Sequence, residues 1–115
     1  MTDLVIWHNP RCSKSRETLA LLRAHGFDPI IVPYLTQPPN EQELRTALLR
    51  LNLKAIEMIR RNEKRFTELG LGQDSPENDL IAAMVENPVL IERPIVFKGS
   101  KAAIGRPPEA VLAIV

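Results

Sequence analysis

The sequence predicts an α/β fold in which a mixed four-stranded sheet is built from the two ends of the chain. Short apolar runs at 4–7 and 30–32 have the length of buried strands, and a run with helical spacing at 17–25 separates them. A third strand-like run, 95–97, lies near the end of the chain. Between the two groups, residues 40–88 carry helical spacing and no strand signal. The predicted order is therefore β-α-β…β-β-α, with a helical insertion at about 40–88.

Length and charge restrict the class of protein. The 115 residues predict a single domain over 1–115 that contains the insertion. Fifteen Lys and Arg against 14 Asp and Glu give a net charge of +1, so no global field attracts nucleic acid or a membrane surface. No apolar run approaches the ~20 residues of a transmembrane helix, and Met1-Thr2-Asp3 lacks the basic start of a signal peptide. We expect a cytoplasmic protein, with a monomer favoured and with no nucleic-acid or membrane partner.

The first three elements predict a parallel pair of strands. Leu4–Trp7 is a strand, and the helix after it closes at His25-Gly26, where a basic residue followed by glycine marks a helix end. The second strand is followed by Pro33, which has no N–H to donate, so we place this strand at a sheet edge. Two strands joined by one helix predict a right-handed crossover with parallel pairing.

Capping signals mark the helices of the middle region. Asn40, with Glu43 three residues later, predicts a capping box. The helix that it starts has one apolar face: Leu44, Leu48 and Leu51. A second helical segment is expected at 54–61, and a short third one leads to Leu69-Gly70.

Proline and glycine mark the later elements. Ser75-Pro76 predicts an N-cap followed by proline at the first helical position, and Asn87-Pro88 ends that helix. Pro94–Lys98 is a strand, and Gly99-Ser100 predicts a two-residue hairpin turn of the type with glycine first, followed by a return strand. A last helix, led by proline, is expected at Pro107–Ile114.

A polar stretch from His8 to Arg16 contains the only cysteine of the chain, Cys12. It follows the first strand and opens the first helix, where free N–H groups and the helix dipole favour negative charge. A free cysteine is often a buried structural residue. The neighbours of Cys12, including Arg11 and Lys14, are polar or basic and do not pack a core. Because positive side chains and a helix N-terminus lower a thiol pKa, we predict that Cys12 is a nucleophilic thiolate.

Two residues near Cys12 are candidate catalytic partners, and each has a structural alternative. Ser15 is spaced to return its hydroxyl toward the sulfur, or it is an ordinary capping serine. His8 is a proton acceptor or an orienting group, or it bonds only a backbone group. A metal site is not predicted, because the other histidine, His25, lies at the far end of the helix and a set of three or four N/S ligands cannot be assembled.

Arg60, Arg93 and Arg106 are candidate oxyanion ligands. Guanidinium groups suit bidentate binding of tetrahedral oxyanions, whereas most arginines are solvated surface residues whose ion pairs contribute little. Sequence spacing alone does not show that the three converge. Pro94 opens the third strand and is expected near Cys12 in this topology, so it is a candidate cis-proline. The alternative is an ordinary trans proline at the first residue of a strand.

Seven motifs, read in order, resemble one family over essentially the whole chain. They are His8-Asn9-Pro10-Arg11-Cys12-Ser13-Lys14-Ser15-Arg16, Tyr34-Leu35 with Pro38-Pro39, Ile59-Arg60-Arg61-Asn62, Glu68-Leu69-Gly70-Leu71, Asn87-Pro88, Ile91-Glu92-Arg93-Pro94-Ile95-Val96 and Arg106-Pro107-Pro108-Glu109. The family is that of the thioredoxin-like arsenate reductases of the glutaredoxin-coupled kind. Ser13-Lys14 after the cysteine looks closer to a housekeeping branch of that family.

The resemblance implies a thioredoxin-like fold and a role for each candidate residue. Cys12 matches the nucleophile that forms a thiol–arsenate adduct, and His8 and Ser15 match residues beside it. The three arginines match oxyanion-binding residues, and Pro94 matches the cis-proline of the family. The implied activity is reduction of arsenate to arsenite, and the implied small-molecule partner is arsenate or a similar oxyanion. No cofactor is expected to be bound, because glutathione acts as co-substrate together with glutaredoxin.

The single cysteine has a mechanistic consequence that does not depend on the resemblance. Without a second cysteine in the chain, an adduct on Cys12 must be resolved by an external thiol. Two other functions stay open. One is a glutathione-dependent thiol oxidoreductase without arsenate activity. The other is a regulator of the same fold that binds RNA polymerase, which Ser15 disfavours because such relatives often carry a Cys-x-x-Cys switch.

Overall fold

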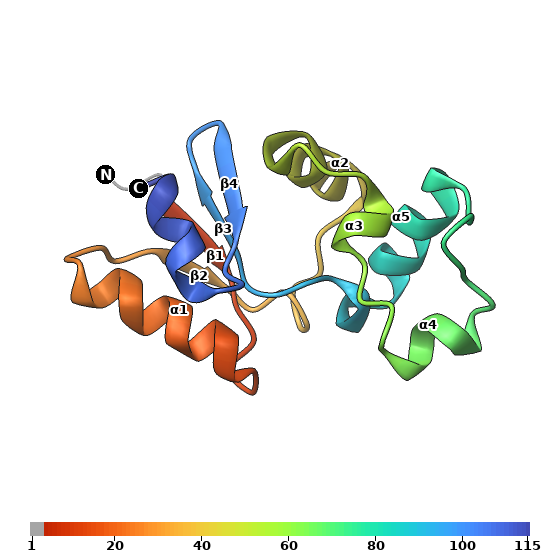
Figure 1. Cartoon of the computed structure of the whole chain (residues 1–115), viewed down its shortest axis with the longest axis horizontal. Coiled ribbons are helices and arrows are strands. Elements are labelled where there is room, and N and C mark those ends of the chain that lie inside the picture. The colour runs from red at the N-terminus through yellow and green to blue at the C-terminus, as the bar shows by residue number, and fades with distance from the viewer. Residues whose placement is uncertain (1–3) are drawn as a thin grey trace. The chain divides into compact units, whose positions relative to one another are not determined.

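The computed structural model describes residues 4–115, and their contacts form two compact units (Figure 1). The first unit contains the described residues up to Gln37 and those from Arg93 onward, and the second is Pro38–Glu92. All four strands lie in the first unit, and the helices of the middle region form the second. The interpretation of the chain as one domain with an insertion stays a prediction.

The first unit contains a mixed four-stranded sheet in the order β2-β1-β3-β4. The strands are β1 (Leu4–Trp7), β2 (Ile30–Val32), β3 (Ile95–Lys98) and β4 (Lys101–Ile104). β1 pairs parallel with β2 and antiparallel with β3, and β3 pairs antiparallel with β4. The α/β class, the mixed sheet and the edge position of β2 are thus confirmed. The turn between β3 and β4 has Gly99 first, at φ +59°, as its sequence predicts.

One face of the sheet carries the core of the first unit. Leu4 and Ile6 alternate on β1, and Val96 lies directly opposite Ile6, so these side chains share one face. Two helical segments cover that face: α1 (Ser13–Ala24) and the 3-10 helix η2 (Pro108–Ala113). The buried cluster joins the sheet residues to Leu19 and Leu22 of α1 and Val111 of η2. Figure 1 shows α1 and the blue C-terminal segment beside the strands.

One covering segment starts where the sequence predicts, and the other differs in type. α1 begins at Ser13 with Cys12 as its N-cap, in agreement with the predicted position of Cys12 at a helix N-terminus. The apolar periodic run begins four residues later, because the start of the helix buries Ser15 and Thr18 in place of apolar side chains. The last segment was predicted as a helix over Pro107–Ile114, and it is a 3-10 helix with Pro107 at its N-cap.

The second unit contains four α-helices and one 3-10 turn. They are α2 (Glu41–Leu51), α3 (Ala55–Met58), α4 (Lys64–Glu68), α5 (Glu77–Glu86) and η1 (Pro88–Leu90). The capping box is confirmed, since Asn40 Oδ1 accepts from Glu43 N at 2.8 Å and Glu43 Oε1 accepts from Asn40 N at 3.0 Å. The segment expected at 54–61 is shorter, because α3 ends at Met58.

The start of α5 differs from its predicted cap by one residue. Pro76, not Ser75, is the N-cap of α5. The Ser75 hydroxyl instead accepts a hydrogen bond from the backbone N–H of Gly72 at 2.9 Å and closes the preceding turn. A Ser-Pro pair thus marks the right place in the chain, but the serine caps a turn and not the helix.

Gly105 allows the end of β4 to approach α1 closely. A Cβ at this position would lie 2.5 Å from Thr18 Oγ1 and 2.7 Å from Pro94 Cγ. Because both neighbours are buried side chains, we expect Gly105→Ala to lower the free energy of unfolding by about 1–3 kcal/mol. Chemical denaturation of the purified protein measures this loss.

Gly72→Ala is the matched control, since a Cβ at Gly72 meets no atom within 4 Å. Its free energy of unfolding should stay within about 0.5 kcal/mol of the wild type. Equal stability of the Gly105 and Gly72 variants would contradict the close approach of α1 and β4.

Candidate active site

The loop between β1 and α1 is a tight turn that delivers Cys12 to the helix start. The Cys12 N–H donates to the Asn9 carbonyl at 3.0 Å, and the Asn9 side-chain oxygen accepts from Arg11 N at 3.0 Å. Asparagine at the first position of such a turn and proline at the second, here Pro10, are both favoured. Cys12 is then the N-cap of α1, with extended backbone at φ −96° and ψ 123°.

The first turn of α1 places backbone N–H groups beside the Cys12 sulfur. The Lys14 and Ser15 N–H groups face the thiol and favour its charged form, although neither reaches strict capping geometry. Each is a helix-terminal donor without an intrahelical acceptor, so a thiolate can use its partial positive charge. Cys12 is partly exposed, which leaves the sulfur accessible to a reactant.

Arg93 and Arg106 bring two guanidinium groups to the thiol from the open end of the β3–β4 hairpin. Arg106 Nη2 donates toward Cys12 Sγ at 3.7 Å, and Arg106 Nε donates to the Arg93 carbonyl at 2.9 Å. The Arg93 guanidinium also favours the thiolate and lowers the pKa of Cys12. The Arg93–Pro94 and Arg106–Pro107 peptide bonds are both cis, and Gly105 N donates to the Pro94 carbonyl at 2.9 Å. The structure thus assembles two of the three predicted arginines around Cys12.

Opposing influences set the pKa of Cys12, and its net direction is downward. Partial burial raises the pKa of the thiol. Three groups lower it: the Ser15 backbone N–H, the Arg93 guanidinium and the Lys14 backbone N–H. Together they outweigh the effect of burial, so the pKa of Cys12 lies below its ordinary value. A larger fraction of the thiol is therefore the nucleophilic thiolate near neutral pH.

His8 and Ser15 form a buried pair that ties β1 to α1. His8 Nδ1 and Ser15 Oγ are 2.7 Å apart, and the same hydroxyl accepts from Asn9 N at 3.0 Å. Ser15 is 0% exposed, and within residues 4–115 these are the hydrogen bonds of its hydroxyl. The expected contact of the hydroxyl with sulfur is therefore replaced by one from the Ser15 backbone N–H.

The environment of His8 keeps its imidazole neutral. Burial lowers the pKa of His8, and the positive charges of Arg23 and Arg16 lower it further. Neutral His8 adds no positive charge near the thiol at pH 7, so the cations beside the sulfur are arginines. The contacts of His8 give it an orienting position in the turn that holds Cys12.

Arg60, the third predicted arginine, lies in the second unit. Its Nε and Nη1 form ion pairs with Glu63 and Glu92 at 3.2 and 3.0 Å. These contacts belong entirely to the second unit, and the assignment of Arg60 to an oxyanion stays a prediction.

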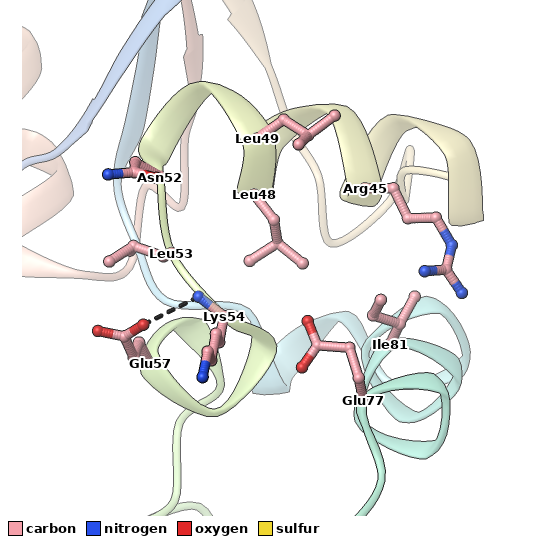
Figure 2. Close-up of a pocket in the computed structure, with 9 residues that line it drawn as sticks. All are labelled: Arg45, Leu48, Leu49, Asn52, Leu53, Lys54, Glu57, Glu77 and Ile81. Atoms are coloured by element: carbon pink, nitrogen blue, oxygen red, sulfur yellow. Dashed lines mark hydrogen bonds between the residues drawn. The ribbon is translucent and has the colours of Figure 1, made fainter.

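The second unit also contains a cavity of about 470 Å³, between α2, α3 and α5 (Figure 2). Its walls combine leucine and isoleucine side chains with charged groups: Arg45, Leu48, Leu49, Asn52, Leu53, Lys54, Glu57, Glu77 and Ile81. None of these side chains is a cysteine, a serine or a histidine, so Cys12 remains the reactive centre to explain. Over residues 4–115, no cluster of three His, Cys, Asp or Glu residues is placed to hold a metal ion. In the same range, no helix combines the length and apolar character needed to cross a bilayer.

Several residues that shape the site were not singled out from sequence. Asn9 closes the turn before Cys12, and the Asn-Pro pair is a turn signal that could have identified it. Gly105 lets the Arg106 segment approach α1, and Glu63 and Glu92 hold Arg60. No local sequence pattern marks Gly105, Glu63 or Glu92. Gly105 and Glu92 contact residues that are distant in the chain, and Glu63 looks in the sequence like any charged surface residue.

Comparison with known proteins gives one consistent result. The ArsC family model matches residues 7–114. A protein of Escherichia coli (strain K12) named "Uncharacterized protein YfgD" is 53% identical over 112 residues, which are 96% of this chain and 94% of that protein. An arsenate reductase of Haemophilus influenzae is 45% identical over 114 residues, 97% of this chain and 98% of that protein. The solved structure of an arsenate reductase from Vibrio cholerae matches with a TM-score of 0.95 at 46% identity, covering 99% of this chain and 98% of that one. The resemblance seen in the motifs is confirmed, and the chain belongs to the ArsC family.

Proposed function

We propose that this protein is an arsenate reductase in which the Cys12 thiolate attacks the arsenic atom. The observation that carries the proposal is the convergence of Arg93 and Arg106 on the thiol at the N-terminus of α1. A thiolate and an oxyanion repel each other, so an attack needs fixed positive charge around both. Full-length relatives named arsenate reductase support arsenate as the oxyanion.

The chemistry consists of two displacements at sulfur and arsenic and a final thiol exchange. The Cys12 sulfur forms a bond to arsenic(V), and one arsenate oxygen leaves as water after protonation. An external thiolate then attacks the Cys12 sulfur, and the electron pair of the sulfur–arsenic bond passes to arsenic, which leaves as arsenite. The resulting mixed disulfide is opened by a second thiol, which restores Cys12. Arsenic gains two electrons, and the two external thiols lose two as they form a disulfide.

The residues around Cys12 supply positioning and charge in this scheme. Arg93 favours the thiolate before attack, and Arg93 and Arg106 neutralise the arsenate oxygens during it. Arg60 is the proposed third oxyanion ligand, with the family motif as its support. Glutathione with glutaredoxin is the proposed source of the external thiols, because the chain has one cysteine and cannot reduce the adduct itself.

An assay of the purified protein tests the proposal. Arsenate, glutathione and glutaredoxin are expected to yield arsenite at a rate proportional to the concentration of the protein, with one disulfide formed per arsenite. The matched control is the protein alkylated at its single cysteine. Absence of arsenite with glutathione and with every other thiol system tried would contradict the proposal. Turnover of a glutathione mixed disulfide without turnover of arsenate would identify a thiol oxidoreductase instead.

A further inference from the structure

A groove of about 550 Å³ lies in the first unit between α1 and η2. Residues of both segments belong to the core cluster of this unit, which holds the two segments side by side on the sheet (Figure 1). One wall of the groove is a face of α1 that includes Lys14, Ala20 and Ala24, and the other wall is Pro107 with the start of η2. The alanine side chains are small and exposed, so they leave room between the two segments that is open to solvent.

One end of the groove lies beside the Cys12 thiol. The Lys14 backbone N–H faces the sulfur, and Pro107 follows Arg106, whose Nη2 lies 3.7 Å from Cys12 Sγ. From Lys14 to Ala24 the groove follows α1 for about 15 Å. An extended tripeptide is about 10 Å long, so the groove has the length to hold a peptide of that size with one end at the sulfur.

Charged side chains on the two walls suit a zwitterion. Lys14 Nζ lies 3.7 Å from Glu17 Oε2, and this ion pair is weak because both side chains are exposed. An ammonium group has three N–H donors, so Lys14 can bind a second carboxylate. Among residues 4–115, no hydrogen bond or ion pair holds the carboxylate of Glu109 on the opposite wall. The groove thus offers a cation near the thiol and a carboxylate across from it.

The first unit also carries an excess of positive charge. Residues 4–37 and 93–115 contain eight Lys and Arg and three Asp and Glu, whereas residues 38–92 contain seven and ten. Most cations of the first unit lie within four residues of Cys12 or beside its sulfur: Arg11, Lys14, Arg16, Arg93 and Arg106. A local excess of one charge attracts molecules of the opposite charge and raises the rate at which they arrive. A thiol with a net negative charge is therefore attracted to Cys12.

We propose that this groove binds the thiol that attacks Cys12, and that this thiol is a peptide of tripeptide size with carboxylate groups and one ammonium group. The inference rests on the proposed function, in which an external thiol resolves the Cys12 adduct and glutathione has this chemistry. Lys14 binds a carboxylate of the peptide, and Glu109 binds its ammonium group. The peptide thiolate is then held next to the Cys12 sulfur, so its attack does not depend on a chance encounter.

A pyridyl disulfide on Cys12 separates this attack from the chemistry of arsenate. Dipyridyl disulfide converts the single cysteine of the protein into a mixed disulfide. An added thiolate forms a bond to the Cys12 sulfur, and the sulfur–sulfur bond breaks with its electron pair on the departing pyridinethiolate, whose absorbance is recorded. Each rate is divided by the rate of the same thiol with a small pyridyl disulfide, which removes differences in intrinsic reactivity.

Glutathione and two of its derivatives test the two charged contacts. The diester lacks both carboxylates, and the N-acetyl derivative lacks the ammonium group. Lys14→Gln should slow glutathione about threefold and should not slow the diester, and Glu109→Gln should slow glutathione about threefold and should not slow the N-acetyl derivative. The control is Lys101→Gln, an exposed cation at the turn end of the hairpin, which should change each rate by less than about 1.5-fold.

Two results of this comparison would overturn the proposal. One is an unchanged rate with glutathione in both Lys14→Gln and Glu109→Gln. The other is equal slowing of glutathione and of the derivative that lacks the matching group, because the charged side chain would then act on the Cys12 disulfide and not on the peptide.

Filling the groove tests where the body of the peptide lies. Ala20→Trp places a large side chain in the groove, so attack by glutathione should slow about tenfold. Mercaptoethanol is too small to need the groove and should slow by less than about twofold. The matched control is Ala82→Trp, an exposed alanine of α5 in the second unit, which should change neither rate. Equal slowing of both thiols by Ala20→Trp would overturn the proposed place of the peptide.

Binding without reaction gives a readout that survives failure of the proposed function. S-methylglutathione cannot attack Cys12, and at millimolar concentration it should shift the amide NMR signals of Ala20, Ala24 and Glu109 but not that of Ala82. This result is expected even if the protein forms no arsenite with any thiol. Unchanged signals along α1 and η2 would overturn the groove as the thiol site, even in a protein that reduces arsenate.

Discussion

Cys12→Ser is expected to reduce arsenite formation to the rate without protein. A serine hydroxyl is not ionised near neutral pH, and it cannot form the sulfur–arsenic bond or the mixed disulfide that the proposed cycle requires. Arsenite formation and disulfide formation are measured in the same assay with glutathione and glutaredoxin. Both should disappear together, because the electrons reach arsenic only through the Cys12 sulfur.

The same substitution leaves the helix start intact, which makes the result interpretable. Cys12 is the N-cap of α1, and serine is a preferred N-cap residue. The thermal midpoint of Cys12→Ser should therefore equal or exceed that of the wild type, and arsenate should still bind. Substantial arsenite formation by a correctly folded Cys12→Ser protein would contradict the nucleophilic role.

Local patterns predicted those parts of the fold that depend on a few neighbouring residues. Three such features follow from the backbone preferences of single residues. They are the capping box of Asn40 and Glu43, the Gly99-Ser100 turn, and the edge position of the strand before Pro33. Each of these signals acts within about four residues, which is the range over which side chains and backbone compete for hydrogen bonds. The structure agrees with them for that reason.

Periodicity failed where buried residues are polar. The start of α1 buries Ser15 and Thr18 at 0% exposure, three residues apart on the inner face of the helix. Ser15 bonds His8 and Asn9, and Thr18 Oγ1 donates to the Lys14 carbonyl at 2.8 Å. Apolar spacing begins only at Leu19, so periodicity alone misses the first turn, which the predicted helix N-terminus at Cys12 places correctly.

The sequence predicted which residue types form the site around Cys12, but it did not predict which residues contact one another. Cys12 and its basic neighbours indicated a thiolate, but the groups that lower its pKa include Arg93, which is distant in the chain. Glu92 is 32 residues from Arg60, and nothing near either residue indicates their ion pair. Contacts of this kind depend on the tertiary arrangement and not on local sequence.

Removal of Arg93 should have a larger effect on the thiol than removal of Arg106. In wild-type protein, the rate of alkylation by iodoacetamide should rise with pH around a midpoint below the ~8.5 of a free thiol, because only the thiolate reacts. Arg93→Gln removes a hydrogen bond and a charge that lower the pKa of Cys12, while the burial that raises it remains. The midpoint therefore moves upward, and alkylation near pH 7 slows.

Arg106→Gln separates the two roles of these arginines. Arg106 Nη2 lies 3.7 Å from the sulfur, but the lowered pKa of Cys12 is due to Arg93 and two backbone N–H groups, so the alkylation midpoint should change less. Both variants should lose about 10²–10³-fold in kcat/KM for arsenate, because each removes a donor that faces the oxyanion in the proposed attack. Lys101→Gln, an exposed cation at the turn end of the same hairpin, is the control for a general change of charge. An unchanged kcat/KM in both arginine variants would contradict an oxyanion site formed by these arginines beside the thiol. Equal shifts of the alkylation midpoint in the two variants would contradict the distinct role of Arg93.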